Sequence, residues 1–133
     1  MLSTYEDYEP EPMSLTLDEM AALHQEMAGE IKGDTEALEL YKDLYTAAVK
    51  YSESRSNWPL WDKEEKLAED SVRTSRHNKV IIAFNMLARY LKILGKPASW
   101  RDTLGEESEN PYYRKRIGDF ACYIVFIGGL NAR

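Results

Sequence analysis

Five polar side chains with the chemistry of a binding or acid–base site lie close together in the middle of the sequence: Asp70, Arg73, Thr74, His77 and Asn78. Side chains three and four positions apart share one face of a helix, so the spacing places these groups on one stripe. A carboxylate, a guanidinium and an imidazole within two turns can bind a ligand or transfer protons, because histidine titrates near neutral pH. The same groups can instead pair with one another and fix the register of packed helices. We favour this structural interpretation and predict no catalytic residue, because active sites usually combine groups from several segments.

The polar stripe continues into an apolar one, formed by Ile81, Phe84, Ala88 and Leu91. This continuity predicts that the polar groups face the protein interior or a neighbouring helix. The run Asp70-x-x-Arg73-Thr74-x-x-His77-Asn78-x-x-Ile81 resembles a pattern in small helical proteins of unknown function from bacteria and their phages. The resemblance covers roughly 25 residues and implies no activity.

Other segments offer little to complete a site. No Cys/His spacing suits zinc, no glycine-rich loop suits phosphate, and the acidic residues do not form a calcium loop, so we predict no metal and no cofactor. We expect His24 to be a partly exposed helix residue. The single cysteine, Cys122, lies between apolar neighbours, which predicts a buried thiol and favours a reducing, cytoplasmic location.

Charge is segregated along the chain. Residues 1–70 carry six basic and 18 acidic residues, a net of −12, whereas residues 71–133 carry 11 basic and five acidic residues, a net of +6. A basic half can bind nucleic acid, and the candidate contacts are Arg76, Lys79, Arg114, Lys115 and Arg116. We favour the alternative that an acidic helix layer packs beside a basic one.

Two tryptophans, Trp58 and Trp61, form a concentrated apolar group in a polar region. They either cap the helical bundle or present a surface to another protein, since tryptophan is frequent at interfaces. The expected partner is therefore another protein or a second copy of this chain. The apolar run at residues 124–127 is far too short to span a bilayer, so we expect no membrane partner.

The remaining patterns are helical. Residues 1–13 contain two prolines and four acids and predict a flexible acidic tail, followed by a single helical domain over residues 14–133. Thr16 and Glu19 have the spacing of a capping box at the start of a helix over residues 17–32, and Gly33 is placed to end it. Asp34 or Thr35 can cap a second helix, which closes between residues 52 and 57. The short joint predicts that these two helices form an antiparallel hairpin.

The second half predicts three further helical segments. A helix over residues 60–94 would be roughly 52 Å long, so a kink or short break near residues 71–75 is expected. Ser99 and Asp102 predict a capping box for a short turn, and Asn110 and Pro111 start a last helix that ends at Gly128 and Gly129.

The predicted fold is an all-α antiparallel bundle of four to five helices, with the apolar C-terminal helix at its centre and the N-terminal hairpin packed across it. The function we predict first is a non-enzymatic protein-interaction or regulatory module. The alternatives are a nucleic-acid-binding protein that uses the basic C-terminal half, and an enzyme or small-ligand binder built on the stripe of Asp70, Arg73 and His77.

Overall fold

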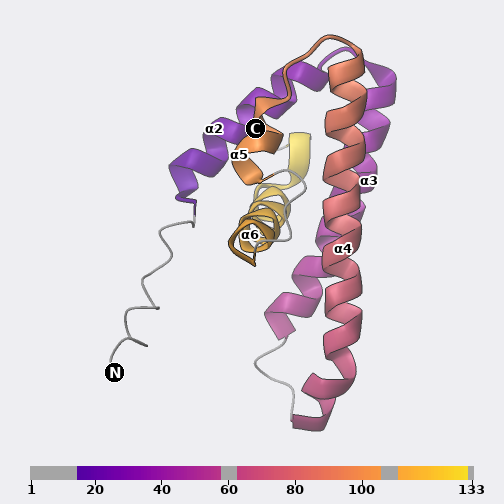
Figure 1. Cartoon of the computed structure of the whole chain (residues 1–133), viewed down its shortest axis with the longest axis vertical. Coiled ribbons are helices and arrows are strands. Elements are labelled where there is room, and N and C mark those ends of the chain that lie inside the picture. Colours follow the sequence, from indigo (N-terminus) through magenta and orange to yellow (C-terminus); the bar gives the residue numbers. More distant parts are fainter. Residues whose placement is uncertain (1–14, 58–62, 106–110, 132–133) are drawn as a thin grey trace.

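The protein is an all-α helical bundle, as the sequence predicts. The structure is a computed structural model, and it describes residues 15–57, 63–105 and 111–131. Within these ranges the helices are α2 (Leu17–Ile31), α3 (Thr35–Asn57), α4 (Lys63–Ile93), α5 (Ser99–Leu104), α6 (Pro111–Ile127) and a 3-10 turn η2 (Gly129–Asn131) (Figure 1). The predicted acidic tail, Trp58 and Trp61 lie outside the described residues.

Helices α3 and α4 form the long antiparallel pair of the bundle (Figure 1). Two contacts tie the pair near opposite ends. The Tyr90 hydroxyl donates to Asp34 Oδ1 at 2.8 Å, and the Arg76 guanidinium donates to the backbone carbonyl of Lys50 at 3.0 Å. Asp34 also caps α3, because its Oδ1 accepts the backbone N–H of Ala37 at 2.9 Å. These hydrogen bonds, that from Ala37 first, lower the pKa of the Asp34 carboxyl.

Helix α4 is continuous over its 31 residues, so the short break considered near residues 71–75 is absent. At 1.5 Å per residue the helix is about 46 Å long. The expectation rested on length alone, since a small domain does not need so long a helix. The unbroken helix has a long partner, because α3 has 23 residues and packs along α4.

Helix α2 begins with the predicted capping box. The backbone N–H of Glu19 donates to Thr16 Oγ1 at 3.0 Å, and the backbone N–H of Thr16 donates to Glu19 Oε1 at 2.9 Å. The helix ends before Gly33, whose φ of 80° is in the left-handed region. Beyond this turn the prediction of a hairpin was wrong. Helix α2 leaves α3 at a wide angle and packs mainly on α5 and α6 (Figure 1).

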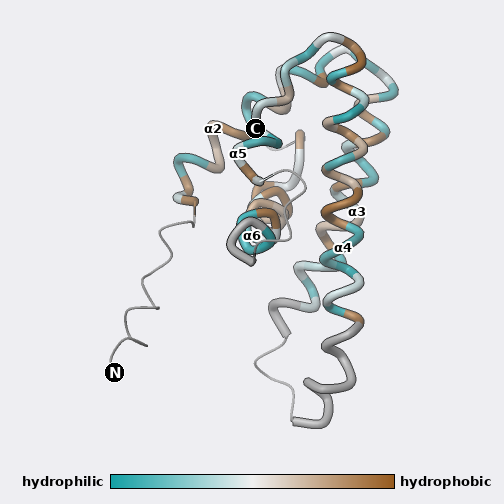
Figure 2. The backbone as a smooth tube through the Cα atoms, in the orientation of Figure 1, coloured by the Kyte–Doolittle hydropathy of each residue, from teal (hydrophilic) through white to brown (hydrophobic). Residues whose placement is uncertain are grey.

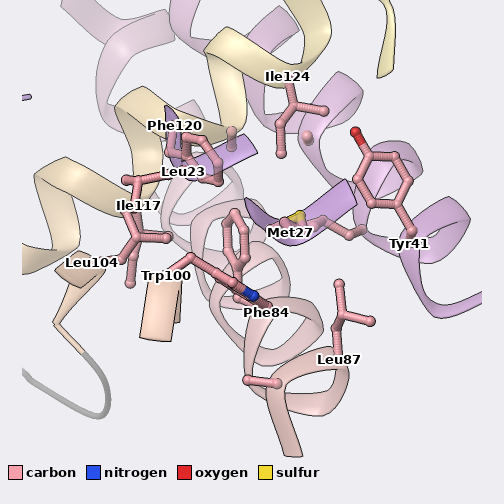
Figure 3. Close-up of a cluster of buried hydrophobic side chains, with 14 of the residues drawn as sticks. Leu23, Met27, Tyr41, Phe84, Leu87, Trp100, Leu104, Ile117, Phe120 and Ile124 are labelled. Atoms are coloured by element: carbon pink, nitrogen blue, oxygen red, sulfur yellow. The ribbon is translucent and has the colours of Figure 1, made fainter. Parts of the chain in front are cut away.

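Helix α6 lies at the centre of the bundle, as predicted, and contacts each of the other four helices. In Figure 2 the first described turn of α6 is teal, and the turns that follow it are tan to brown. One core contains buried side chains from all five helices (Figure 3), among them Met27, Ile31, Leu44, Phe84, Leu87, Trp100, Leu104, Ile117, Phe120 and Ile124. Of the helices that the structure describes, none is long and apolar enough to cross a membrane.

One side of α6 faces solvent, which corrects the prediction for Cys122. This residue is partly exposed and packs against the core without being buried in it. It lies on the same helical stripe as Lys115, Asp119 and Phe126, and the Phe126 side chain is 81% exposed. The apolar neighbours of Cys122 in sequence belong to other faces of the helix, which is why the sequence misplaced it.

Candidate functional site

The polar stripe that the sequence singled out lies on α4, and the structure distributes its members between interior and surface. Arg73 and His77 are half-buried, whereas Thr74 and Asn78 are exposed. Asp70 belongs to α4, but its side chain lies outside the described residues, so the predicted pairing of Asp70 with Arg73 or His77 stays a prediction.

His77 and Asn78 join α4 to the beginning of α6. The Nε2 atom of His77 lies 2.9 Å from the backbone carbonyl oxygen of Arg114. Because a carbonyl oxygen only accepts, Nε2 carries the proton of this hydrogen bond. The imidazole also stacks on the ring of Tyr51, with centroids 4.7 Å apart, and Asn78 Oδ1 accepts a hydrogen bond from Arg114 Nη2 at 2.9 Å. These contacts of His77 and Asn78 link α4 to α6 and α3. We call them the His77 clasp, and they are those expected of residues that stabilise the packing of helices.

Among the candidate nucleic-acid contacts on α4, Arg76 is turned inward along α3. Its guanidinium donates both to the backbone carbonyl of Lys50 and to the hydroxyl of Ser54, so it joins α4 to the C-terminal part of α3. Lys79 is exposed. The two cations therefore differ: one holds two helices together, and the other faces solvent.

The three consecutive cations of α6 also have partners within the chain. Arg114 donates to Asn78 as described above. Lys115 Nζ forms an ion pair with Asp119 Oδ2 at 3.0 Å, and the Arg116 guanidinium donates to the backbone carbonyl of Thr103. Arg114 and Arg116 are half-buried, which leaves less of their charge available to phosphate than the sequence pattern implied.

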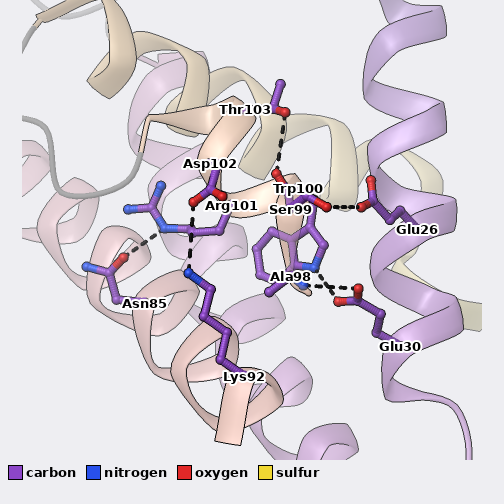
Figure 4. A network of polar contacts seen from close by, with 10 residues as sticks. All are labelled: Glu26, Glu30, Asn85, Lys92, Ala98, Ser99, Trp100, Arg101, Asp102 and Thr103. Carbon is purple, nitrogen blue, oxygen red and sulfur yellow. Dashed lines mark hydrogen bonds and ion pairs between the residues drawn. The ribbon is translucent and has the colours of Figure 1, made fainter. Parts of the chain in front are cut away.

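A polar network that sequence reasoning missed fixes α5 against α2 (Figure 4). The carboxylate of Glu30 accepts the backbone N–H of Ala98 at 3.1 Å and the indole N–H of Trp100 at 2.9 Å. Glu26, one turn earlier, accepts the hydroxyl of Ser99 at 3.0 Å. The predicted capping box of the short helix was wrong, because residue 98 is its N-cap and no side chain caps it. Glutamates from α2 occupy this helix start instead.

Arg101 is the charged side chain at the centre of the same region. It is 1% exposed, and its Nε donates to Asn85 Oδ1 at 2.7 Å. On the solvent side, Lys92 and Asp102 form an ion pair at 3.9 Å (Figure 4). Together with the glutamates of α2, these contacts hold α5 between α2 and α4.

His24 is buried, at 8% exposure, against the expectation that it is partly exposed. Its Nε2 lies 2.7 Å from the Tyr41 hydroxyl, and its ring makes edge contacts with Phe120 and Tyr123. Burial lowers the pKa of the His24 imidazole and raises the pKa of the Tyr41 phenol, with Tyr45 adding to the second effect. The expectation failed because α2 turns this side toward α6.

An open groove of about 760 Å³ lies between α3 and the C-terminal turn. Its lining includes Tyr41, Tyr45, Gly129 and Leu130 beside charged residues of α3. The hydroxyl of Tyr41 is directed to His24, so the groove does not present it as an acid or base. Within the described ranges, no three His, Cys, Asp or Glu side chains gather to hold a metal ion.

The outer face of α4 carries a regular row that the sequence analysis did not single out. Seven exposed positions follow one another at alternating spacings of three and four, and we call them the α4 seam: Val72, Ser75, Lys79, Ile82, Met86, Arg89 and Ile93. Four of these side chains are large and apolar, and they are 37% (Val72), 55% (Ile82), 49% (Met86) and 77% (Ile93) exposed. This alternating spacing is that of the a and d positions of coiled coils, which pack against another helix.

A groove of about 190 Å³ borders the α4 seam, where Leu40, Asp43 and Ala47 of α3 lie beside Lys79, Ile82, Ala83 and Met86 of α4. A second helix could therefore contact the exposed side chains of the seam and the shallow groove beside them. The signal was present in the sequence as the spacing from residue 72 to residue 93. It was hidden because Val80, Ile81 and Ile82 are all apolar, so the apolar pattern alone does not show which face is buried.

Comparison with known proteins adds no further identification: no family model, curated protein or solved structure matches the chain. The resemblance of residues 70–81 to small helical proteins of bacteria and phages therefore stays a prediction.

Proposed function

We propose that this chain is a non-enzymatic protein-interaction module whose α4 seam docks a helix of another protein. One observation carries the proposal: the row of seven exposed positions with heptad spacing, four of them apolar, on a face of α4 that the described helices leave uncovered. Recognition of an amphipathic helix by an apolar row or groove is a recurring mode of binding between proteins.

The energetics support docking. Covering a large aliphatic side chain contributes about 1.5–3 kcal/mol relative to leaving it in water. The seam offers Ile82, Met86 and Ile93, which are each about half exposed or more. Covering what remains exposed of these three side chains contributes roughly 3–5 kcal/mol, and the apolar side chains of a partner helix that are buried at the same time add a comparable amount to offset the cost of association.

The alternatives have less support. Arg76, Arg114, Lys115 and Arg116 are engaged within the chain, which weakens the case for a nucleic-acid surface. His77 lies in a clasp between helices, which weakens the case for a ligand site on the polar stripe. Trp58 and Trp61 stay candidates for an additional partner surface. The single cysteine accords with a cytoplasmic location, which belongs to this proposal.

Site-specific photocrosslinking in the native cells tests the proposal. A photoreactive amino acid replaces Met86 in the seam, and a matched control replaces Asp18, which is exposed on α2 on the other side of the molecule. We expect a discrete adduct with one other protein from position 86 and none from position 18. Adding Ile82→Glu should abolish the adduct while stability falls by only about 1 kcal/mol, because this side chain is already 55% exposed.

Two results would overturn the proposal. The first is the absence of any adduct from position 86. The second is the same set of adducts from both positions, since that would mean that crosslinking follows exposure and not a docking surface.

A further inference from the structure

We infer that the helix docked on the α4 seam is acidic, with carboxylates facing Lys79 and Arg89. This inference rests on the proposed function and adds the chemistry of the partner. Two of the seven seam positions are basic, and both side chains are exposed. Among the described residues, no hydrogen bond or ion pair engages Lys79 or Arg89, so both charges are available to a partner.

The surroundings of the two cations are positive on the α4 side. From residue 72 to residue 93 the helix contains five basic residues and no acidic one. Arg73, Arg76 and Lys92 are held in contacts within the chain, so the free charges of this stretch lie in the seam itself. On the α3 side of the groove, Asp43 has the opposite sign. A partner helix therefore meets positive charge along α4 and, on the α3 side of the groove, the carboxylate of Asp43. Farther along the same stripe of α3, Glu36 is exposed as well.

The spacing of the two cations defines the partner further. Lys79 and Arg89 are ten residues apart, which is about 15 Å along the helix axis. A helix that packs along the seam with matching heptads needs two carboxylates at the same separation, with apolar side chains between them to cover Ile82 and Met86. Such a helix is amphipathic and carries its acids within the apolar face, not only on its solvent side.

A second copy of this chain fits the seam poorly. A parallel pair of α4 helices in register places Lys79 against Lys79 of the second copy, and Arg89 against Arg89. An antiparallel pair that sets Ile82 against Met86 places Lys79 against Arg89 at both ends. Like charges that face one another across an interface disfavour the pairing, and no acid of the same helix segment compensates them.

Binding of two synthetic peptides to the full chain tests the inference. The peptides are identical three-heptad amphipathic helices with leucine at the seam positions, except that two seam positions ten residues apart are glutamate in one and lysine in the other. Fluorescence anisotropy of labelled peptide gives the dissociation constants. We expect the glutamate peptide to bind at least about tenfold more tightly, because two surface charge pairs change from attraction to repulsion.

Charge reversal supplies the decisive variants. The double variant Lys79→Glu/Arg89→Glu should prefer the lysine peptide. The matched control Lys32→Glu/Lys42→Glu has the same change in net charge at exposed sites outside the seam, and it should keep the preference of the unmodified chain. Circular dichroism checks that each variant is folded.

Several outcomes would overturn the inference. Equal binding of both peptides, abolished by Ile82→Glu, would leave the docking face standing and refute its acidic partner. Binding of neither peptide would count against the proposed function as well. A dimer in sedimentation that Ile82→Glu dissociates would show that a second copy covers the seam. Binding of a duplex DNA that the double reversal abolishes, with neither peptide bound, would assign the two cations to nucleic acid.

Discussion

Substitution of Glu30 by glutamine tests how α5 is held in place. The carboxylate accepts the backbone N–H of Ala98 with one oxygen and the indole N–H of Trp100 with the other. Glutamine has a single amide oxygen, and its NH2 group would face a donor. One of the two N–H groups therefore loses its acceptor.

The expected loss follows from burial. Trp100 is fully buried, so its indole cannot exchange the lost acceptor for water. Leaving a buried donor unsatisfied costs about 1–3 kcal/mol, and we expect Glu30→Gln to lower the free energy of unfolding by that amount. Glu26→Gln is the matched control, because its hydrogen bond to Ser99 is exposed, and it should cost no more than about 0.5 kcal/mol.

Urea unfolding followed by far-UV circular dichroism measures both variants, and the midpoint should move at constant slope. A double-mutant cycle with Trp100→Phe assigns the loss, since removal of the indole donor should reduce the effect of Glu30→Gln. Equal losses in Glu30→Gln and Glu26→Gln would refute the reasoning, because they would show that the bonds of Glu30 are no more important than an exposed one.

Three further predictions concern other parts of the bundle. Burial lowers the pKa of His24 from its ordinary value of 6.5, so the unfolded chain binds the proton more readily than the folded chain. The free energy of unfolding should therefore reach its highest value above pH 6.5 and decrease as the pH drops toward the folded pKa. In a series of urea unfolding curves at different pH, His24→Phe should reduce this dependence. Gly129→Ala places a Cβ 3.2 Å from the Tyr45 ring at a φ of 73°. Gly95→Ala, at a φ of 91°, meets no neighbour within 4 Å and should lose only the backbone cost of about 1–2 kcal/mol. Thermal unfolding should therefore show a larger loss of stability for Gly129→Ala, and equal losses would contradict the close approach to Tyr45. His77→Phe keeps a stacked ring but removes a hydrogen bond to α6, so it should cost about 0.5–1.5 kcal/mol in urea unfolding, and no loss would mean that the clasp does not contribute to stability.

The sequence located the helices well where a local signal marks their ends. The capping box of Thr16 and Glu19, the turn at Gly33 and the start of the last helix at Pro111 all lie where the structure has them. These signals act within four residues, so they can be read without the fold. The central position of α6 was also predictable, because its second half, residues 120–127, is apolar and most of such a surface must be covered by other helices.

The packing of the N-terminal half could not be read in the same way. The glutamate that fixes α5 is 70 residues from the tryptophan it binds, and no periodicity links the two positions. Likewise, the short joint after α2 permits a hairpin but does not require one. The direction of α2 is set by contacts with α5 and α6. The sequence shows that Glu26 and Glu30 share a face, but not what that face meets.

In the candidate site, too, the sequence revealed one feature and missed another. The polar stripe around His77 was found because unusual residue types stand out, and the structure places two of its members in contacts with α6. The α4 seam was overlooked because its apolar residues look like core. Val80 is buried and Ile82 is exposed, and only the positions of α3 and α6 decide which of the two is covered.

The long separation between α2 and its supports has a consequence for synthesis on the ribosome. The hydrogen bonds that join α2 to α5 span 68 to 73 residues. At about 5–20 residues per second, roughly 4–14 s pass between the emergence of Glu30 and that of Trp100. A single 15-residue helix is marginal in water, so during this interval the apolar side of α2, with Met27 and Ile31, has no lasting cover. The first described helix to leave the ribosome is thus among the last to be consolidated, and a chaperone has several seconds in which to bind it.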